Sequence, residues 1–259
     1  MLPEVALSAG GPGALGPTAS SLTRTSDAPE AVQPVPDYLR LHYWWAYVHP
    51  KAVRVFERAW LVNLILWGNY ERLVEAALGL LGARLPGRTL QVACVYGDLT
   101  NRLAGRVADG HGQLDVVDVL PVQLANLRRK LPADAPVQLL RQDSSALAMA
   151  DACYERALLF FLLHEQPADI RHRTVSEALR VVRPGGRLVI VDFASPRWWH
   201  PLRYLWLPVL RRLEPFAAEL WADDIRGWLK ESPLIGSIAR RLVFGGMYQM
   251  VTITRAGDR

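Results

Sequence analysis

The sequence predicts an α/β protein with a seven-stranded, mostly parallel sheet and helices on both faces. Three observations lead to this prediction. Apolar runs of strand length alternate with amphipathic helical patterns from residue 89 onward, as expected for repeated βαβ units. A glycine-containing loop, 95–98, follows the first apolar run. Two alternating stretches joined by Gly245 and Gly246 lie near the end of the chain, which indicates an antiparallel hairpin at one edge of the sheet.

Each element is expected from its own pattern. The strands are expected over 89–94, 112–119, 137–140, 156–163, 187–193, 237–243 and 248–255. The helices between them are expected over 99–107, 122–131 and 170–182. The run Arg183-Pro184-Gly185-Gly186 predicts a tight turn before the fifth strand. This order, with the last strand reversed, is the Rossmann-like arrangement of class I methyltransferases.

The rest of the chain is assigned by composition. Residues 1–35 are rich in Gly, Ala, Pro, Ser and Thr and predict a disordered tail ahead of one domain over 36–259. Residues 36–86 have a helical, heavily aromatic pattern that Pro50 divides, which predicts a helical lid. Its aromatic side chains either pack in the core or line a pocket for an apolar ring substrate. The segment 196–230 mixes tryptophans with arginines, which predicts either a cap over the sheet or a surface at the lipid headgroups.

Composition favours a protein that contacts a membrane surface without crossing it. The chain has nine Trp and 51% hydrophobic residues, but no apolar run reaches the ~20 residues that span a bilayer. A net charge of +5 favours anionic surfaces. Because no basic stretch is interleaved with aromatics in the manner of RNA binding, we expect lipid and not nucleic acid as the partner. Two cysteines are too few for a disulfide framework and indicate a reducing, cytoplasmic compartment.

The loop after the first strand nearly matches a cofactor-binding motif. In class I methyltransferases this loop runs acidic-x-x-x-Gly-x-Gly, and its glycines let the backbone approach the methionine end of S-adenosylmethionine (SAM). Here Gln91 stands at the acidic position, Val95 stands at the first glycine, and Tyr96 precedes the retained Gly97. The loop, which continues into Asp98, therefore predicts SAM binding with an altered environment for the amino-acid end of the cofactor.

Two further strand ends carry acidic residues suited to the same cofactor. Asp118 ends the second strand, where its carboxylate can accept hydrogen bonds from both ribose hydroxyls. Asp143, with Ser144 beside it, follows the third strand and can accept the adenine amino hydrogens. An acid after each of these strands together with the glycine loop is more specific than a glycine motif alone.

The fourth and fifth strands end in His164-Glu165 and in Asp192. One interpretation is a divalent metal site with mixed nitrogen and oxygen ligands from these three residues. Another is that they orient or deprotonate a substrate. A third is structural, with His164 capping the following helix and Glu165 paired with an arginine.

The chain resembles the rhodoquinone biosynthesis protein family (RquA) over about residues 36–255. The resemblance is carried by the runs 36–40, 42–50, 67–70, 91–100, 115–131 and 158–166. More distantly the chain is similar to ubiquinone and menaquinone methyltransferases, whose loops keep the acid and both glycines that are absent here.

The resemblance implies conversion of ubiquinone to rhodoquinone by replacement of a ring methoxy group with an amino group. It implies SAM as the amino donor, manganese (Mn2+) as the metal, and a location at the cytoplasmic face of the inner membrane. Tyr96, His164 and Glu165 are then the expected catalytic residues. At Gln91 a neutral amide in place of an acid removes a charge that keeps the SAM α-amine protonated, so we expect this amine to act as the nucleophile.

Two other functions stay open from the sequence. One is an ordinary C- or O-methyltransferase of a quinone precursor, against which Gln91 and Val95 argue. The other is a non-catalytic quinone-binding or scaffold module with a decayed loop, against which the retained Asp118 and Asp143 argue. The oligomeric state is not predicted.

Overall fold

The computed structural model describes residues 35–42, 57–213, 215–222, 225–229 and 232–257. The chain separates into two units, Met1–Val32 and Gln33–Arg259, and every described residue belongs to the second. The predicted tail therefore lies outside the described residues apart from Val35, as does the predicted helix break at Pro50.

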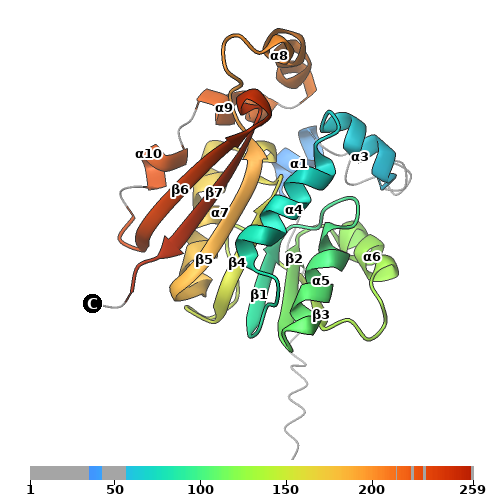
Figure 1. The fold of residues 1–259 in the computed structure, drawn as a ribbon, viewed down its shortest axis with the longest axis vertical. Helices are drawn as coiled ribbons and strands as arrows, with labels where there is room; N and C mark the ends of the chain where they lie inside the picture. Colours follow the sequence, from blue (N-terminus) through green and yellow to red (C-terminus); the bar gives the residue numbers. More distant parts are fainter. Residues whose placement is uncertain (1–34, 43–56, 214, 223–224, 230–231, 258–259) are drawn as a thin grey trace, which may run out of the picture. The chain divides into compact units, whose positions relative to one another are not determined.

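A seven-stranded sheet forms the centre of the second unit, as predicted (Figure 1). The strands run in the spatial order β3-β2-β1-β4-β5-β7-β6. Their bounds are β1 Arg88–Val92, β2 Gln113–Asp118, β3 Val137–Arg141, β4 Tyr154–Phe160, β5 Val182–Phe193, β6 Ile235–Val243 and β7 Tyr248–Arg255. Strands β1 to β5 are parallel to one another, and β7 is antiparallel to both β5 and β6. The reversed last strand is thus confirmed.

The helices of the described residues are α1 Asp37–His42, α3 Ala59–Ile65, α4 Tyr70–Leu81, α5 Leu99–Asp109, α6 Pro121–Lys130, α7 Ala168–Val181, α8 Pro201–Leu213, α9 Pro215–Ala222 and α10 Ile225–Leu229. The three helices predicted between strands agree with α5, α6 and α7 to within about two residues at each end. The tight turn predicted at 183–186 lies within β5, which begins at Val182. Val182 pairs with Tyr154 of β4, and the register of the two strands shifts after this pair.

The two faces of the sheet bury different side chains, as alternation along a strand requires. In β4, Leu158 and Phe160 belong to the cluster that packs under α4 and α5. Ala157 and Leu159 of the same strand belong to the cluster under α7, α9 and α10. Figure 1 shows α4 and α5 on one face with α7 on the other. Because both faces are covered here, β4 ends in the buried apolar run 157–160 and β5 contains the buried apolar run 188–191.

The segment 196–230 forms α8, α9 and α10 between β5 and β6. At α9, Phe216 packs edge-to-face on Tyr38 of α1 at a centroid distance of 6.4 Å. Leu39 and Leu120 lie in the same small apolar cluster. The N-terminal helix and the cap therefore meet near the carboxyl end of β2. Among the described residues, every helix is too short or too polar to cross a membrane.

Candidate functional site

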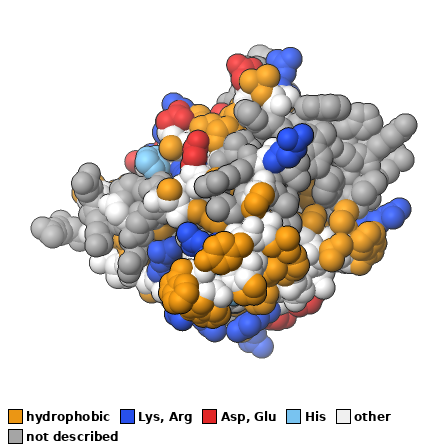
Figure 2. All heavy atoms as spheres, turned by 90° about the horizontal axis from the view of Figure 1, so that it is seen from above, with side chains coloured by type: hydrophobic (Ala, Val, Ile, Leu, Met, Phe, Trp, Pro, Cys, Tyr) orange, Lys and Arg blue, Asp and Glu red, His pale blue; other side chains and the backbone are white. Residues whose placement is uncertain are grey.

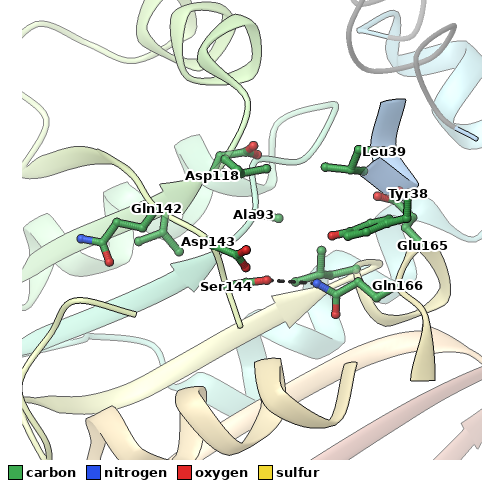
Figure 3. A pocket seen from close by; sticks show the side chains of 12 residues that line it. Tyr38, Leu39, Ala93, Asp118, Gln142, Asp143, Ser144, Glu165 and Gln166 are labelled. Atoms are coloured by element: carbon green, nitrogen blue, oxygen red, sulfur yellow. Dashed lines mark hydrogen bonds between the residues drawn. The ribbon is translucent and has the colours of Figure 1, made fainter. Parts of the chain in front are cut away.

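A pocket opens at the carboxyl ends of the parallel strands (Figure 3). Its walls come from the ends of β1, β2, β3 and β4 and from α1. Its lining residues are Tyr38, Leu39, Ala93, Val117, Asp118, Val119, Gln142, Asp143, Ser144, Leu162, Glu165 and Gln166. The strand order reverses between β1 and β4, and ligands of open α/β sheets bind at such a switch point. Three carboxylates in one pocket suit a ligand that carries positive charge, such as a sulfonium.

Asp118 lies where the sequence placed it, at the end of β2 and in the pocket wall. One carboxylate oxygen accepts the Cys94 N–H and the other accepts the Leu120 N–H, both at 2.8 Å. These bonds fix the carboxylate and leave lone pairs for further donors, such as two vicinal hydroxyls. Burial raises the pKa of Asp118 to about 6, against the lowering effect of the two backbone donors.

Asp143 and Ser144 also line the pocket, and both are held by local bonds. Oδ1 of Asp143 accepts the N–H and the hydroxyl of Ser145, each at 2.8 Å. The Ser144 hydroxyl bonds to Thr174 of α7 and accepts Gln166 Nε2, both at 3.0 Å. Figure 3 shows the Asp143 carboxylate facing the interior of the pocket. Asp143 is thus positioned as a ligand acceptor, whereas the Ser144 hydroxyl ties the pocket floor to α7.

Gln91 lies below the loop and not in the pocket wall. The residue is 0% exposed, and its Nε2 donates to Ala93 O and to Thr100 Oγ1, each at 3.0 Å. Its Oε1 is buried without a hydrogen-bond partner among the described residues. Ala93, which lines the pocket, has a left-handed φ of 70° that favours glycine. A carboxylate at position 91 could donate neither bond. The amide therefore holds the loop by two hydrogen bonds that an acid could not make in the same way.

Asp98 has a structural role. It is the N-cap residue of α5, its side chain is half exposed, and Tyr70 Oη donates to its Oδ1 at 3.0 Å. The same Tyr70 oxygen accepts the N–H groups of Asp98 at 2.9 Å and Leu99 at 3.1 Å. Neither Asp98 nor Gly97 is in the pocket wall. Their contact with the cofactor therefore stays a prediction.

Tyr96 and Val95 occupy the altered half of the loop, and both are partly buried. The Tyr96 hydroxyl accepts Gln123 Nε2 of α6 at 2.9 Å. Burial raises the pKa of Tyr96, and the charges of Glu165, Glu57 and Asp118 raise it further. The phenol is therefore protonated at neutral pH and lies within electrostatic reach of the pocket carboxylates.

His164 and Asp192 form a buried pair at the ends of β4 and β5. His164 Nδ1 lies 2.9 Å from Asp192 Oδ1, and Asp192 is 0% exposed. The two Asp192 oxygens also accept the N–H groups of Leu163 at 2.7 Å, His164 at 3.4 Å and Phe193 at 2.7 Å. Because a carboxylate only accepts hydrogen bonds, the proton between the two side chains is placed on Nδ1 of His164. The other ring nitrogen, Nε2, is then the basic one.

The predicted three-residue metal site is not formed. No group of three His, Cys, Asp or Glu side chains in the described part of the chain could hold a metal ion. Asp192 turns its oxygens to backbone amides and to Nδ1, and His164 Nε2 lies 3.8 Å from Glu165 Oε1. The donor set does not fit Mn2+ as predicted, and Asp192 is reassigned as the residue that orients His164.

Sequence reasoning did not assign several residues that shape the site. Gln142 and Gln166 line the pocket, and Tyr38 was named only among the lid aromatics. Figure 3 shows the Tyr38 ring directed from α1 across the pocket. Burial raises the pKa of Tyr38, as does the charge of Asp143. No sequence motif identifies these three residues as pocket residues. Only the folded arrangement of the chain brings their side chains to the pocket.

The chain has the Rossmann-like fold of class I methyltransferases. Residues 89–186 match the family model described as "Methyltransferase domain". Among solved structures, the chain is similar to an O-methyltransferase family protein from Burkholderia thailandensis, with a TM-score of 0.59, 16% identity, and coverage of 81% of this chain and 61% of that one. It is also similar to the N-methyltransferase NodS from Bradyrhizobium japonicum, with a TM-score of 0.53, 15% identity, and coverage of 73% and 96%.

The curated relatives are quinone-biosynthesis methyltransferases. A demethylmenaquinone methyltransferase from Beutenbergia cavernae is 33% identical over 141 residues, covering 53% of this chain and 54% of that protein. The ubiquinone/menaquinone biosynthesis C-methyltransferase UbiE from Stutzerimonas stutzeri is 28% identical over 142 residues, covering 52% and 54%. The chain thus spans about half the length of the curated relatives it matches.

Proposed function

We propose that the protein is a SAM-dependent transferase of a quinone head group, and that it replaces a ring methoxy group of ubiquinone by an amino group taken from SAM. The product is rhodoquinone. Binding of SAM is supported by the methyltransferase fold, by Asp118 and Asp143 in the pocket, and by the match over 89–186. A quinone-type substrate is supported by the names of the curated relatives.

The observation that carries amination over methylation is the hydrogen bonding of Gln91. An acid here would favour a charged ammonium beside the loop, whereas an amide contributes no charge. In addition, Gln91 Nε2 occupies a lone pair of the carbonyl oxygen of Ala93, a residue that lines the pocket, so this lone pair is not available to an ammonium. Both effects favour a neutral, nucleophilic α-amine. In the proposed step this amine attacks the ring carbon that bears methoxy, and the methoxy group leaves as methanol. The resulting adduct, joined to the cofactor through nitrogen, then loses its α-proton while the quinone ring takes up the electron pair. Water hydrolyses the Cα=N bond that forms, which releases the reduced quinol form of rhodoquinone and the α-keto acid of the cofactor.

We assign the proton transfer in this step to His164, which directly precedes the pocket residue Glu165 although it is not itself in the pocket wall. The Asp192 carboxylate fixes its ring and directs the basic Nε2 away from β5. The nitrogen loses one proton as the carbon–nitrogen bond forms, and the departing methoxide gains one. We assign both transfers to His164, with Glu165 at 3.8 Å stabilising the imidazolium form.

The test is an incubation of the purified protein with a short-tailed ubiquinone and SAM, labelled in one sample at the α-nitrogen and in another at the methyl carbon. Nitrogen label in a quinone that has lost one methoxy group supports amination. Methyl label in the product supports conventional C- or O-methylation, the second candidate, which the names of the curated relatives favour. Label in neither product contradicts both, provided that SAM binding is shown by calorimetry.

We also propose that the protein binds a membrane surface through α8 and the residues before it. Trp198 is 76% exposed, Tyr204 is 66% exposed, and Trp199 and Leu205 are exposed beside them. Figure 2 shows hydrophobic side chains gathered on this face with Lys and Arg side chains among them. Exposed aromatics mixed with cations are typical of surfaces at the level of lipid headgroups.

Co-sedimentation with vesicles tests this surface. We expect binding to vesicles that contain phosphatidylglycerol and weaker binding to pure phosphatidylcholine. The double variant Trp198→Ser, Trp199→Ser should lose most of the binding. Leu242→Ser, which changes an exposed apolar residue on β6, is the matched control. Equal binding by all three proteins would remove this surface from the proposal.

A further inference from the structure

Three consecutive N–H groups of the cofactor loop donate to side chains that precede β1. Gly97 N donates to Glu57 Oε1 at 3.1 Å, while the N–H groups of Asp98 and Leu99 donate to Tyr70 Oη. Such a run of amides at the start of a helix is the part of the loop best able to receive an anion. In this chain it already has acceptors from within the protein.

The two acceptors differ in kind. Tyr70 is buried on α4, uncharged, and bonded to two amides and to Asp98, so it is a permanent cap of α5. Glu57 is a carboxylate that lies just before α3 and is partly exposed. It is therefore the acceptor that a competing anion can replace at lower cost.

The donors around Glu57 are those expected of a carboxylate-binding site. Besides Gly97 N, they are Asn126 Nδ2 on Oε2 and Lys130 Nζ on Oε1, each at 2.5 Å. Lys130 also donates to Gly97 O at 2.7 Å, so its ammonium is fixed to the loop itself. An amide, an ammonium and a backbone N–H thus converge on one carboxylate. Any carboxylate of suitable reach satisfies the same three donors.

The Glu57 carboxylate lies close to the part of the loop that differs from the usual motif. The charges of Glu57 and Lys130 both act on the Cys94 thiol, and the charge of Glu57 acts on Tyr96 together with Glu165 of the pocket. Tyr96 is thus within electrostatic reach of both Glu57 and the pocket. A ligand whose amino-acid end follows the loop from Ala93 toward Gly97 would bring its own carboxylate to these donors.

We propose that Gly97 N, Asn126 and Lys130 form the subsite for the amino-acid carboxylate of the cofactor, and that Glu57 occupies this subsite as an internal competitor. The inference rests on the proposed function, because it requires binding of SAM. Glu57 then lowers the apparent affinity for ligands that carry the carboxylate and leaves unchanged the affinity for ligands that lack it.

Calorimetric titration of two ligands tests the competition. S-adenosylhomocysteine carries the amino-acid end, and 5′-methylthioadenosine lacks it. In Glu57→Ala we expect S-adenosylhomocysteine to bind on the order of tenfold more tightly, as when a binding-competent state of ~10% becomes fully populated. The affinity for 5′-methylthioadenosine should be unchanged. Lys130→Met should weaken S-adenosylhomocysteine selectively.

The matched control is Asp151→Ala, which removes an exposed carboxylate that pairs with Arg180 just before β4. It should change neither affinity, and circular dichroism checks that each variant is folded. Weaker binding of S-adenosylhomocysteine by Glu57→Ala, or an equal change for both ligands, would overturn the competition. Failure of the wild-type protein to bind either ligand would instead overturn the proposed function, and this inference with it.

Discussion

The Tyr70 hydroxyl occupies the space that a β-carbon on Gly97 would need, and it caps the first turn of α5 from there. Gly97 has a φ of 85°, which other residues adopt only with strain. The retained glycine of the loop is thus explained by a neighbour inside the protein, and not only by the approach of a cofactor.

Tyr70→Phe should therefore destabilise the protein. It leaves the N–H groups of Asp98 and Leu99 without their acceptor in a partly buried place, which costs about 1–3 kcal/mol for each group left unsatisfied. Urea denaturation followed by circular dichroism measures the loss. Tyr204→Phe, which removes an exposed hydroxyl bonded to Trp198 O, is the control and should cost less than about 1 kcal/mol. Equal losses would contradict the capping role.

Binding of SAM should depend on pH through Asp118. Its pKa is raised to about 6 by burial, and the ribose hydroxyls donate best to the ionised form. Affinity should therefore fall as the pH drops below 6, by up to about tenfold per pH unit. The sign for stability is opposite: the folded protein holds this proton more tightly than the unfolded chain, so the contribution of Asp118 to stability decreases as the pH rises from about 4 to 6. Calorimetry of Asp118→Asn should show weak binding without this pH dependence.

Asp192→Asn should lower turnover about a hundredfold or more without loss of the pocket. An asparagine amide can donate to Nδ1, which moves the proton of His164 to Nε2 and removes the base. Because proton transfer is the affected step, the kcat should fall while the Kd of SAM stays within about twofold. A kcat close to that of the unchanged protein would exclude His164 as the base. Thermal unfolding separates this result from a loss of fold.

Gln91→Glu should reduce nitrogen transfer and leave SAM bound. The variant restores an acid of nearly the same size, but it cannot donate to Ala93 O and Thr100 Oγ1. A carboxylate at this point favours the protonated α-amine, which is not nucleophilic. We expect at least about a tenfold fall in labelled amino product. Gln123→Glu on α6, which removes the donor to Tyr96, is a control for charge near the loop. Unchanged nitrogen transfer in Gln91→Glu would contradict the role of this residue.

The sequence predicted those parts of the site that follow from strand order. Asp118, Asp143 and Glu165 lie in the pocket because parallel strands end at one edge, and this topology can be deduced from the alternation of elements. Asp192 also lies at a strand end, but its oxygens face backbone amides and not a ligand. That orientation depends on how the chain turns after β4, which no pattern encodes.

Residues that reach the site from a distance were not predicted. Glu57 contacts Gly97 across 40 positions of sequence, and Tyr70 contacts Asp98 across 28. Glu57 belongs to no motif. Tyr70 ends the run 67–70 that carries the family resemblance, but nothing in that run indicates a contact with the loop. They are identified only by the fold, which brings Glu57 and α4 to the loop.

The contacts of Glu57 and Tyr70 also affect where the N-terminal boundary of the functional unit lies. The matching family model starts at residue 89, after both of them. A fragment cut at that point would keep every strand of the sheet except the first residue of β1, yet it would lack the acceptors of three loop amides. Expression of such a fragment should yield a protein whose loop is misshapen although its signature is intact. The boundary recognised by sequence conservation and the boundary of the functional unit are therefore two different places in this chain.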